Sequence, residues 1–241
     1  MNQAAATPGL VTWSVRLAVL SLVLLPISVL LVRSGAWQAG LPLIGIACLG
    51  AVVLMVLMLI LVALPRFAPF RSKLLRGMLC AIPGVLVVGS LAGGGNAPPI
   101  HDITTDTVDP PSFVTAAEAR GPGTNSLDIK PDFIEQQKAA YPDLASIQSP
   151  LPAAAALSRA VATATDLGWE VYHQDNAAGI VEAVDTTQIM GFKDDVVIRV
   201  RADGTGSTVD LRSVSRVGLS DIGANAARIR DFVAAFTAAN G

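Results

Sequence analysis

Three apolar stretches in the first 96 residues have the length of membrane-spanning helices. They run from about residue 13 to 32, from 41 to 64, and from 77 to about 91. A spanning helix needs about 20 mostly apolar residues. The second stretch lies inside an uncharged segment, whereas the third is short and ends just before Gly93-Gly94-Gly95. The pattern predicts a membrane domain of three transmembrane helices over residues 1–96.

The pattern changes after residue 96. From there to residue 151 the chain is rich in Pro, Asp, Ser and Thr and contains only short apolar patches. This composition is typical of irregular structure. Residues 97–151 are therefore predicted to form an extended arm and linker, with one helical turn in the segment 131–140.

Regular periodicities return in residues 152–241. Apolar residues three and four positions apart predict a helix from Pro152 to about Leu167, followed by the helix-stopping Gly168. Alternating segments at 169–173, 180–185, 195–200 and 207–213 are typical of strands, with turns at 175–179 and 203–206. A second helix is expected over about 221–239. The sequence predicts an α+β C-terminal domain in the order helix, four antiparallel strands, helix, with both helices on one face of the sheet.

Composition also favours a membrane protein. Hydrophobic residues make up 52% of the chain, charged residues only 15%, and the mean hydropathy is +0.55. Residues 97–241 hold 11 basic and 19 acidic residues, a net charge of −8, which argues against a nucleic-acid-binding surface. Both cysteines, Cys48 and Cys80, fall within predicted spans. The C-terminal part is therefore expected to have neither a disulfide nor a zinc–thiolate site.

Basic residues predict the orientation in the membrane. The segment from Arg66 to Arg76 carries four basic residues, whereas the segment between the first two spans carries only Arg33. By the positive-inside rule the four-charge segment is cytoplasmic. Three crossings then place the N-terminus in the cytoplasm and the C-terminal domain in the periplasm, with the spans in the inner membrane. A cleaved signal peptide is the rival interpretation of the first span, but Arg33 stands where small residues are needed for cleavage.

One long motif suggests a family. The stretches Trp169-Glu170-Val171, residues 192–199 and above all residues 210–229, with the pattern RSxSRxGxSDxGxNxxRI, resemble the domain-of-unknown-function family 1499. The resemblance covers roughly residues 100–240. It implies a membrane-associated protein of bacterial or plastid-related type, and the family has no agreed activity.

The same motif gathers the side chains with chemical potential. They are Arg212, Ser213, Ser215, Arg216, Ser220, Asp221, Asn225 and Arg228, with Asp194 and Asp195 one hairpin away as supporting acids. Guanidinium groups beside a helix N-terminus can bind a phosphate, a carboxylate or an anionic lipid headgroup. Alternatively, Arg212 and Arg216 pair with the two acids in an internal network, in which Asn225 caps a loop. Catalysis by the cluster is the third possibility.

Catalytic templates match the sequence poorly. The histidines of the C-terminal part, His101 and His173, are expected at the surface or at a sheet edge. The sequence has no phosphate-binding glycine loop and no metal-ligand spacing, so we predict no catalytic residue, metal or cofactor. The prediction is an integral inner-membrane protein with a periplasmic module for binding or scaffolding, whose partners are the lipid bilayer, a membrane protein complex or an anionic lipid. The alternative is an envelope or lipid-modifying enzyme that uses residues 212–221.

Overall fold

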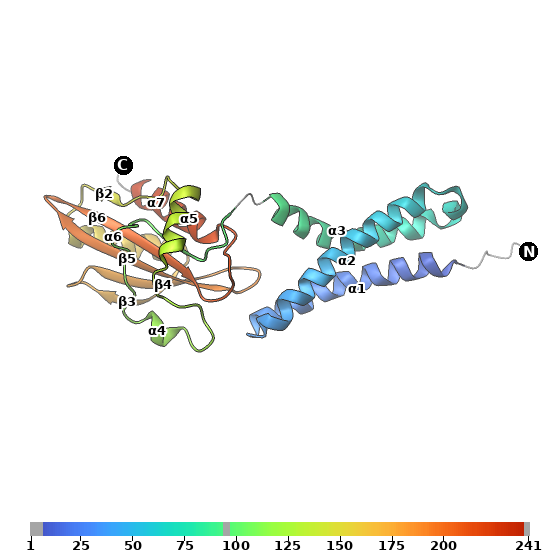
Figure 1. Cartoon of the computed structure of the whole chain (residues 1–241), viewed down its shortest axis with the longest axis horizontal. Helices are drawn as coiled ribbons and strands as arrows, with labels where there is room; N and C mark the ends of the chain where they lie inside the picture. Colours follow the sequence, from blue (N-terminus) through green and yellow to red (C-terminus); the bar gives the residue numbers. More distant parts are fainter. Residues whose placement is uncertain (1–6, 94–96, 239–241) are drawn as a thin grey trace, which may run out of the picture. The chain divides into compact units, whose positions relative to one another are not determined.

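The computed structural model of the chain describes residues 7–93 and 97–238. The chain divides into two compact units, Met1–Gly95 and Asn96–Gly241. Figure 1 shows the first as a group of long helices and the second as a sheet with helices packed on it. The predicted fold class, three long apolar helices followed by an α+β domain, is confirmed.

The first unit consists of α1 (Gly9–Arg33), α2 (Trp37–Ala63) and α3 (Arg71–Gly93). All three are long and apolar enough to cross a membrane. Small and apolar residues such as Ala18, Ala51 and Met58 are buried between them, whereas large apolar side chains such as Leu30 and Ile46 point outward. An apolar outer surface of this extent suits lipid and not water, so the protein is membrane-associated.

The third helix is longer than the sequence predicted. It begins at Arg71 instead of Gly77, after a short 3-10 helix, η1 (Pro65–Phe70). Arg71, Lys73 and Arg76 therefore lie in the first turns of α3 and not in a loop. The prediction began after the last charged residue, Arg76, but Arg and Lys are good helix formers, and Leu74 between them is fully buried.

Two glycines allow the helices of this unit to approach closely. A Cβ atom at Gly77 would lie 2.8 Å from Val15 Cγ2, and one at Gly84 would lie 2.7 Å from Ala51 Cβ. Both distances are too short for any side chain. Close contact at small residues is the usual way in which helices pack inside a bilayer.

The second unit is built on a six-stranded sheet with the order β1-β6-β5-β4-β3, in which β2 also pairs with β6. The strands are β1 (Asp102–Thr104), β2 (Ile147–Ser149), β3 (Glu170–Asp175), β4 (Ile180–Thr186), β5 (Lys193–Asp203) and β6 (Gly206–Ser215). All pairs are antiparallel. The last four strands are the predicted ones: β4, β5 and β6 extend the predicted segments, whereas β3 begins one residue later, at Glu170, and ends two residues later.

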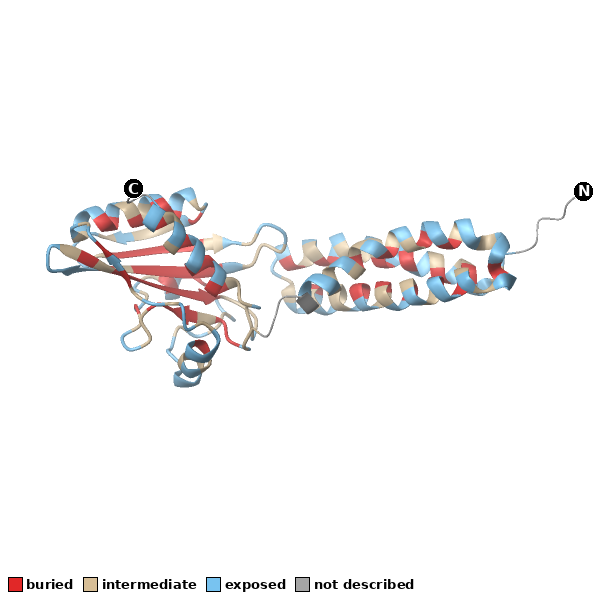
Figure 2. Cartoon of the chain, turned by 90° about the horizontal axis from the view of Figure 1, so that it is seen from above, coloured by how far each residue is buried: buried red, intermediate tan, exposed pale blue. Residues whose placement is uncertain are grey.

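Two helices cover one face of this sheet. They are α6 (Ala153–Asp166) and α7 (Ala224–Ala238), and the predicted end of the second helix at Ala239 lies outside the described residues. Phe232 and Phe236 of α7 are fully buried, and Trp169 stacks on Phe232 with ring centroids 5.6 Å apart. Figure 2 shows the central strands buried along most of their length. Burial of this apolar face is the main source of stability of the unit.

The arm is more regular than the sequence predicted. It adds β1 and β2 to the free edge of β6, and it contains α4 (Ala116–Ala119) and the ten-residue helix α5 (Pro131–Ala140) in place of a single turn. A strand of three residues is too short to show a period of two in the sequence. Its stability comes from pairing with a strand that is distant in the sequence. Between Thr105 and Leu127 the arm contacts Glu182, Asp195 and Arg212. These side chains alternate with those that face the helices, so the arm covers the opposite face of the sheet.

Candidate functional site

Asp194 and Asp195 are neighbours on β5, and their side chains lie on opposite faces of the sheet. Asp194 contacts Arg228 of α7, whereas Asp195 contacts Arg120 of the arm and Arg216 after β6. Both aspartates are buried. The predicted cluster is therefore two separate networks with the sheet between them.

Arg228 organises the network on the helix-covered face. Its Nε donates to Asp185 Oδ2 at 2.7 Å, and its Nη2 donates to Asp194 Oδ2 at 2.5 Å. Its Nη1 donates to Ser213 Oγ at 3.1 Å and to Asn225 Oδ1. Four of the five N–H groups of the guanidinium thus have a partner, and two carboxylates of the same chain lie beside its charge.

Asn225 lies inside the same network. Its amide nitrogen donates to Ser215 Oγ at 2.9 Å and to the backbone carbonyl of His101 at 3.1 Å, and its amide oxygen accepts from Ser213 Oγ at 2.6 Å. Asn225 was expected to cap a loop, but it is fully buried and connects α7 to the ends of β1 and β6. The backbone N–H groups at the start of α7 are satisfied by Asp221, four residues earlier.

Asp195 is the centre of the network on the arm-covered face. Arg216 binds it with both ends of the guanidinium fork, Nε to Oδ2 at 2.9 Å and Nη2 to Oδ1 at 2.7 Å. Arg120 Nε lies 3.0 Å from Oδ2, and the Tyr172 hydroxyl lies 3.5 Å from Oδ1. The pairing of Arg216 with one of the two predicted acids is thus present.

The pKa values in this network follow burial and the Asp195 charge. Burial lowers the pKa of Arg120, whose side chain is only 2% exposed. Burial acts in the same direction on Arg216, but the hydrogen bonds to Asp195 prevail and raise its pKa. Both arginines stay charged at neutral pH, because a guanidinium group does not deprotonate in proteins. Burial and the adjacent carboxylate raise the pKa of Tyr172, which therefore stays a neutral phenol.

A second buried acid lies on the same face of the sheet and binds the arm. Glu182 is fully buried and accepts hydrogen bonds from the backbone N–H groups of Val114 and Thr115 and from the Thr115 hydroxyl. Two acids thus face two arginines beneath the arm. Within the described residues, Arg120 Nε and Nη1 are both buried without a hydrogen-bond partner, although Nε forms the ion pair with Asp195, so Nη1 is left without either kind of contact.

Arg212 has different partners from those expected. Its guanidinium group binds Asp102 of β1 through two hydrogen bonds of 2.9 and 2.7 Å, and Nη2 also donates to the carbonyl of Leu127 at 2.7 Å. The Phe113 ring lies 5.5 Å from its central carbon. The predicted pairing of Arg212 with Asp194 or Asp195 was wrong. Arg212 lies on β6 and pairs with Asp102 of β1, the neighbouring strand that the arm contributes.

Ser220 and Asp221 form the loop before α7. Asp221 accepts the N–H groups of Gly223 and Asn225, each at 2.8 Å, and so acts as the predicted helix cap. Burial raises the pKa of Asp221. Ser220 Oγ accepts the N–H group of Ile222 at 3.2 Å. The helix N-terminus is thus occupied by an internal carboxylate.

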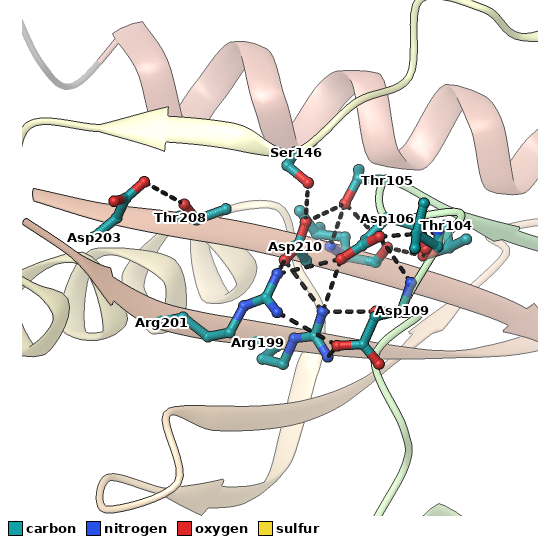
Figure 3. Close-up of polar contacts among 12 residues, drawn as sticks. Thr104, Thr105, Asp106, Asp109, Ser146, Arg199, Arg201, Asp203, Thr208 and Asp210 are labelled. Atoms are coloured by element: carbon teal, nitrogen blue, oxygen red, sulfur yellow. Dashed lines mark hydrogen bonds and ion pairs between the residues drawn. The ribbon is translucent and has the colours of Figure 1, made fainter.

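A third charged cluster was missed by the sequence reasoning. Asp210, fully buried on β6, contacts Arg201 at 2.8 Å and Arg199 at 3.4 Å, and the same two arginines contact Asp106 and Asp109 of the arm (Figure 3). Ser146 and Thr105 also donate to Asp210 (Figure 3). Three acids surround two arginines. One signal was present: Arg199 and Arg201 alternate on one strand face and need acids opposite them.

The candidate residues lie in different surroundings. A hollow of about 300 Å³ reaches Arg228 and Asp185, beside Trp169 and Asp231, whereas Arg212 and Asp195 are covered by the arm. His101, expected near the surface, is buried against Phe133 with ring centroids 5.0 Å apart. His173 lies on the edge strand β3, as expected. Within residues 7–93 and 97–238, no three His, Cys, Asp or Glu side chains are placed to hold a metal ion.

The charged clusters and the sheet lie within a segment that matches a known family. Residues 102–236 match the family described as "Protein of unknown function (DUF1499)". The chain belongs to this family. The match begins at β1 and ends within α7, so it includes the arm and all three charged clusters. No curated protein matches the chain.

Proposed function

We propose that this DUF1499 protein is an integral inner-membrane protein that presents its C-terminal unit in the periplasm as a non-catalytic binding or scaffolding module. The observation that carries the proposal is that Arg212, Arg216 and Arg228 each contact a carboxylate of the same chain. Arginines engaged in this way hold the arm, sheet and helices in one arrangement. A binding partner therefore contacts the outer surface of the C-terminal unit and not these arginines.

The orientation is proposed from the distribution of basic residues. Arg66, Arg71, Lys73 and Arg76 lie between the end of α2 and the apolar part of α3, whereas Arg33 lies at the end of α1. An exported-only phosphatase fused after Gly241 should be active, and a reporter that works only in the cytoplasm should be inactive. The reverse pattern would contradict the periplasmic placement without affecting the argument about the arginines.

A second function has one observation in its favour. Arg120 Nη1 is buried beside Arg216 without a partner of its own. A small anion such as phosphate would satisfy it, and an anion site under the arm would suit an enzyme that acts on lipid headgroups. Since Asp195 already forms ion pairs with both Arg120 and Arg216, the structural interpretation remains the leading one.

Replacement of Arg216 by alanine separates the two functions. In the full chain, solubilised in mild detergent, Arg216→Ala should lower the free energy of unfolding by about 1.5–3 kcal/mol, because a hydrogen-bonded charge is lost while Arg120 still neutralises Asp195. The matched control is Arg230→Ala, which removes the same charge from the exposed pair with Asp143 and should cost at most about 1 kcal/mol.

Melting in inorganic phosphate completes the test. Under the scaffolding proposal phosphate raises the melting temperature of the wild type no more than that of Arg216→Ala. If Arg216→Ala melts like the wild type without phosphate but loses a stabilisation that phosphate gives to the wild type, the anion site is supported and the scaffolding role is rejected.

A further inference from the structure

We propose that one end of the sheet inserts apolar loop side chains into the membrane interface, with Ile189, Leu219 and Ile222 as the contact residues. The occupant of this surface is the lipid bilayer that holds α3. The inference rests on the proposed membrane insertion of α3 and names a partner for the exposed surface of the module.

Strand order brings these residues to one end of the sheet. β4 ends at Thr186 and β5 begins at Lys193, so the connecting loop with Ile189 lies at this end. β6 ends at Ser215, next to Asp194, and the following loop carries Leu219 and Ile222. β1 begins at the same end, since Asp102 pairs with Val214. The lead-in segment, residues 97–101, therefore joins the unit at the end where both loops emerge.

The loops after β4 and β6 differ from the hairpin turns at the opposite end of the sheet in the side chains they expose. Leu219 is 85% exposed, Ile189 73% and Ile222 55%. At the opposite end the turns 176–179 and 204–205 contain only Asn, Ala, Gly and Thr. Scattered single apolar residues would need no explanation, but three large ones gather at the end that receives the chain from the span.

Hydrogen bonds fasten the second loop to the lead-in segment. The N–H group of Asp221 donates to the carbonyl of Ile100 at 3.1 Å, and the Ser220 hydroxyl lies 3.4 Å from the carbonyl of Pro98. The ring of His101 lies 3.4 Å from the carbonyl of Leu219. Leu219 and Ile222 therefore stay beside the first residues of the unit.

Chain length then limits how far these residues can lie from the bilayer. The apolar part of α3 ends at Leu91. The chain from Leu91 to Ala97 cannot span more than about 22 Å even when fully extended. The headgroup region adds several ångströms beyond the hydrocarbon, and apolar interfacial side chains act at a depth of about 5–10 Å in that region. The bilayer surface is thus within reach of the loop, whatever the orientation of the two units.

The backbone at Ile222 supports a role for its outward side chain. Its φ is +54°, and it is the one non-glycine residue with a positive φ in the described part of the chain. A β-branched residue is disfavoured there, and glycine would relieve the strain. Exposure of the Ile222 side chain to water is unfavourable, and so is its backbone conformation. Contact of the side chain with lipid compensates for both of these unfavourable contributions.

Site-specific quenching tests the proposal in the full chain. A background with Cys48→Ala and Cys80→Ala receives single cysteines by Leu219→Cys, Ile222→Cys or Ile189→Cys, each labelled with a polarity-sensitive fluorophore. Ala177→Cys and Thr205→Cys, at the opposite end of the sheet, are the matched controls. The protein is reconstituted in phosphatidylcholine vesicles, with or without nitroxide-labelled acyl chains.

The expected result is that nitroxide lipid quenches the labels at Leu219 and Ile222 at least about twofold more than the two controls, as interfacial insertion requires. The label at Ile189 should follow, and it keeps the test valid if Ile222→Cys does not fold. Equal quenching of the labels at the two ends of the sheet would overturn the proposal. It would also be overturned if the labels at Leu219 and Ile222 entered an apolar environment only after other membrane proteins were added. Quenching does not depend on the side of the membrane or on the Arg216 result, so its failure is distinct from failure of the proposed function.

Discussion

On the helix-covered face of the sheet, Asp194 meets Arg228, whose other partners are Asp185, Ser213 and Asn225. On the arm-covered face, the adjacent Asp195 meets Arg216 and also Arg120, which comes from the arm. The first network is made by β4–β6 and α7. The second is incomplete until a distant segment has closed over the sheet.

The difference shows what the family motif encodes. Ser213, Ser215, Asn225 and Arg228 lie on the helix-covered side and meet one another, so the motif contains most of its own partners there. Arg212 and Arg216 lie on the other side and depend on Asp102 and on the backbone carbonyl of Ala119, both in the arm, for part of their contacts. We infer that the side chains of the motif connect the sheet, α7 and the arm to one another through hydrogen bonds and ion pairs.

The largest effect is expected from Asp195→Ala. It leaves Arg120 and Arg216 without their carboxylate, and their side chains are only 2% and 13% exposed. An uncompensated buried charge costs about 3–5 kcal/mol of unfolding free energy. Thermal and denaturant unfolding of the full chain in detergent would measure it. Asp203→Ala, in the exposed turn of the same strand, is the control, and an equal loss in both variants would contradict a central role for Asp195.

A smaller loss is expected from the neighbouring change, Asp194→Ala. Arg228 keeps Asp185, Ser213 and Asn225 after the substitution, so its charge remains paired. The cost should be that of hydrogen bonding to a charged group, about 1.5–3 kcal/mol. The same unfolding measurement would compare the two aspartates directly. A larger loss for Asp194 than for Asp195 would reverse the ranking of the two faces.

The sequence predicted the parts whose signal is local. Alternation and helical spacing located β3 to β6 with α6 and α7, and the motif placed Ser213, Asn225 and Arg228 in one candidate cluster. Short windows of sequence carry this information, because each element repeats its own period.

The sequence could not predict the contribution of the arm. β1 and β2 have three residues each and are held by pairing with β6, and Arg120 gains its role only from Asp195 on a distant strand. Such contacts have a large sequence separation and no periodic signature. The buried position of His101 was missed for the same reason, because Phe133 and Leu219 come to it from elsewhere in the chain.

A pH effect is expected from His101, which adjoins the helix-side network through its backbone carbonyl. Burial lowers its pKa, a hydrogen bond with the Leu219 carbonyl opposes this, and Lys130, Asp102 and Asp221 act at longer range. The unfolded chain therefore binds the proton first. Stability is fully present above the ordinary histidine pKa of about 6.5 and is lost as the pH falls toward the lower folded value.

Comparison with His101→Gln isolates this effect. Asp221 has a raised pKa, so its protonation stabilises the fold as the pH falls and acts in the opposite direction. The difference in melting temperature between wild type and His101→Gln should shrink between about pH 8 and about pH 5.5, because only the wild type pays for protonating a buried imidazole. A pH-independent difference would contradict the prediction, because it would mean that the pKa of His101 is the same in the folded and the unfolded chain.

The smallest effect is expected from Asp109→Ala in the third charged cluster. Asp109 contacts Arg199 and Arg201 on the arm-covered face, but its side chain is 68% exposed, and Asp106 and Asp210 keep both arginines paired. Exposed ion pairs contribute at most about 1 kcal/mol, and salt screens them. The loss should therefore be below that value and should shrink further when unfolding is measured in high salt. A loss of unfolding free energy as large as that of Asp195→Ala, and unchanged by salt, would contradict this expectation. It would show that the loss depends on the face of the sheet on which the charge lies and not on how deeply the charge is buried.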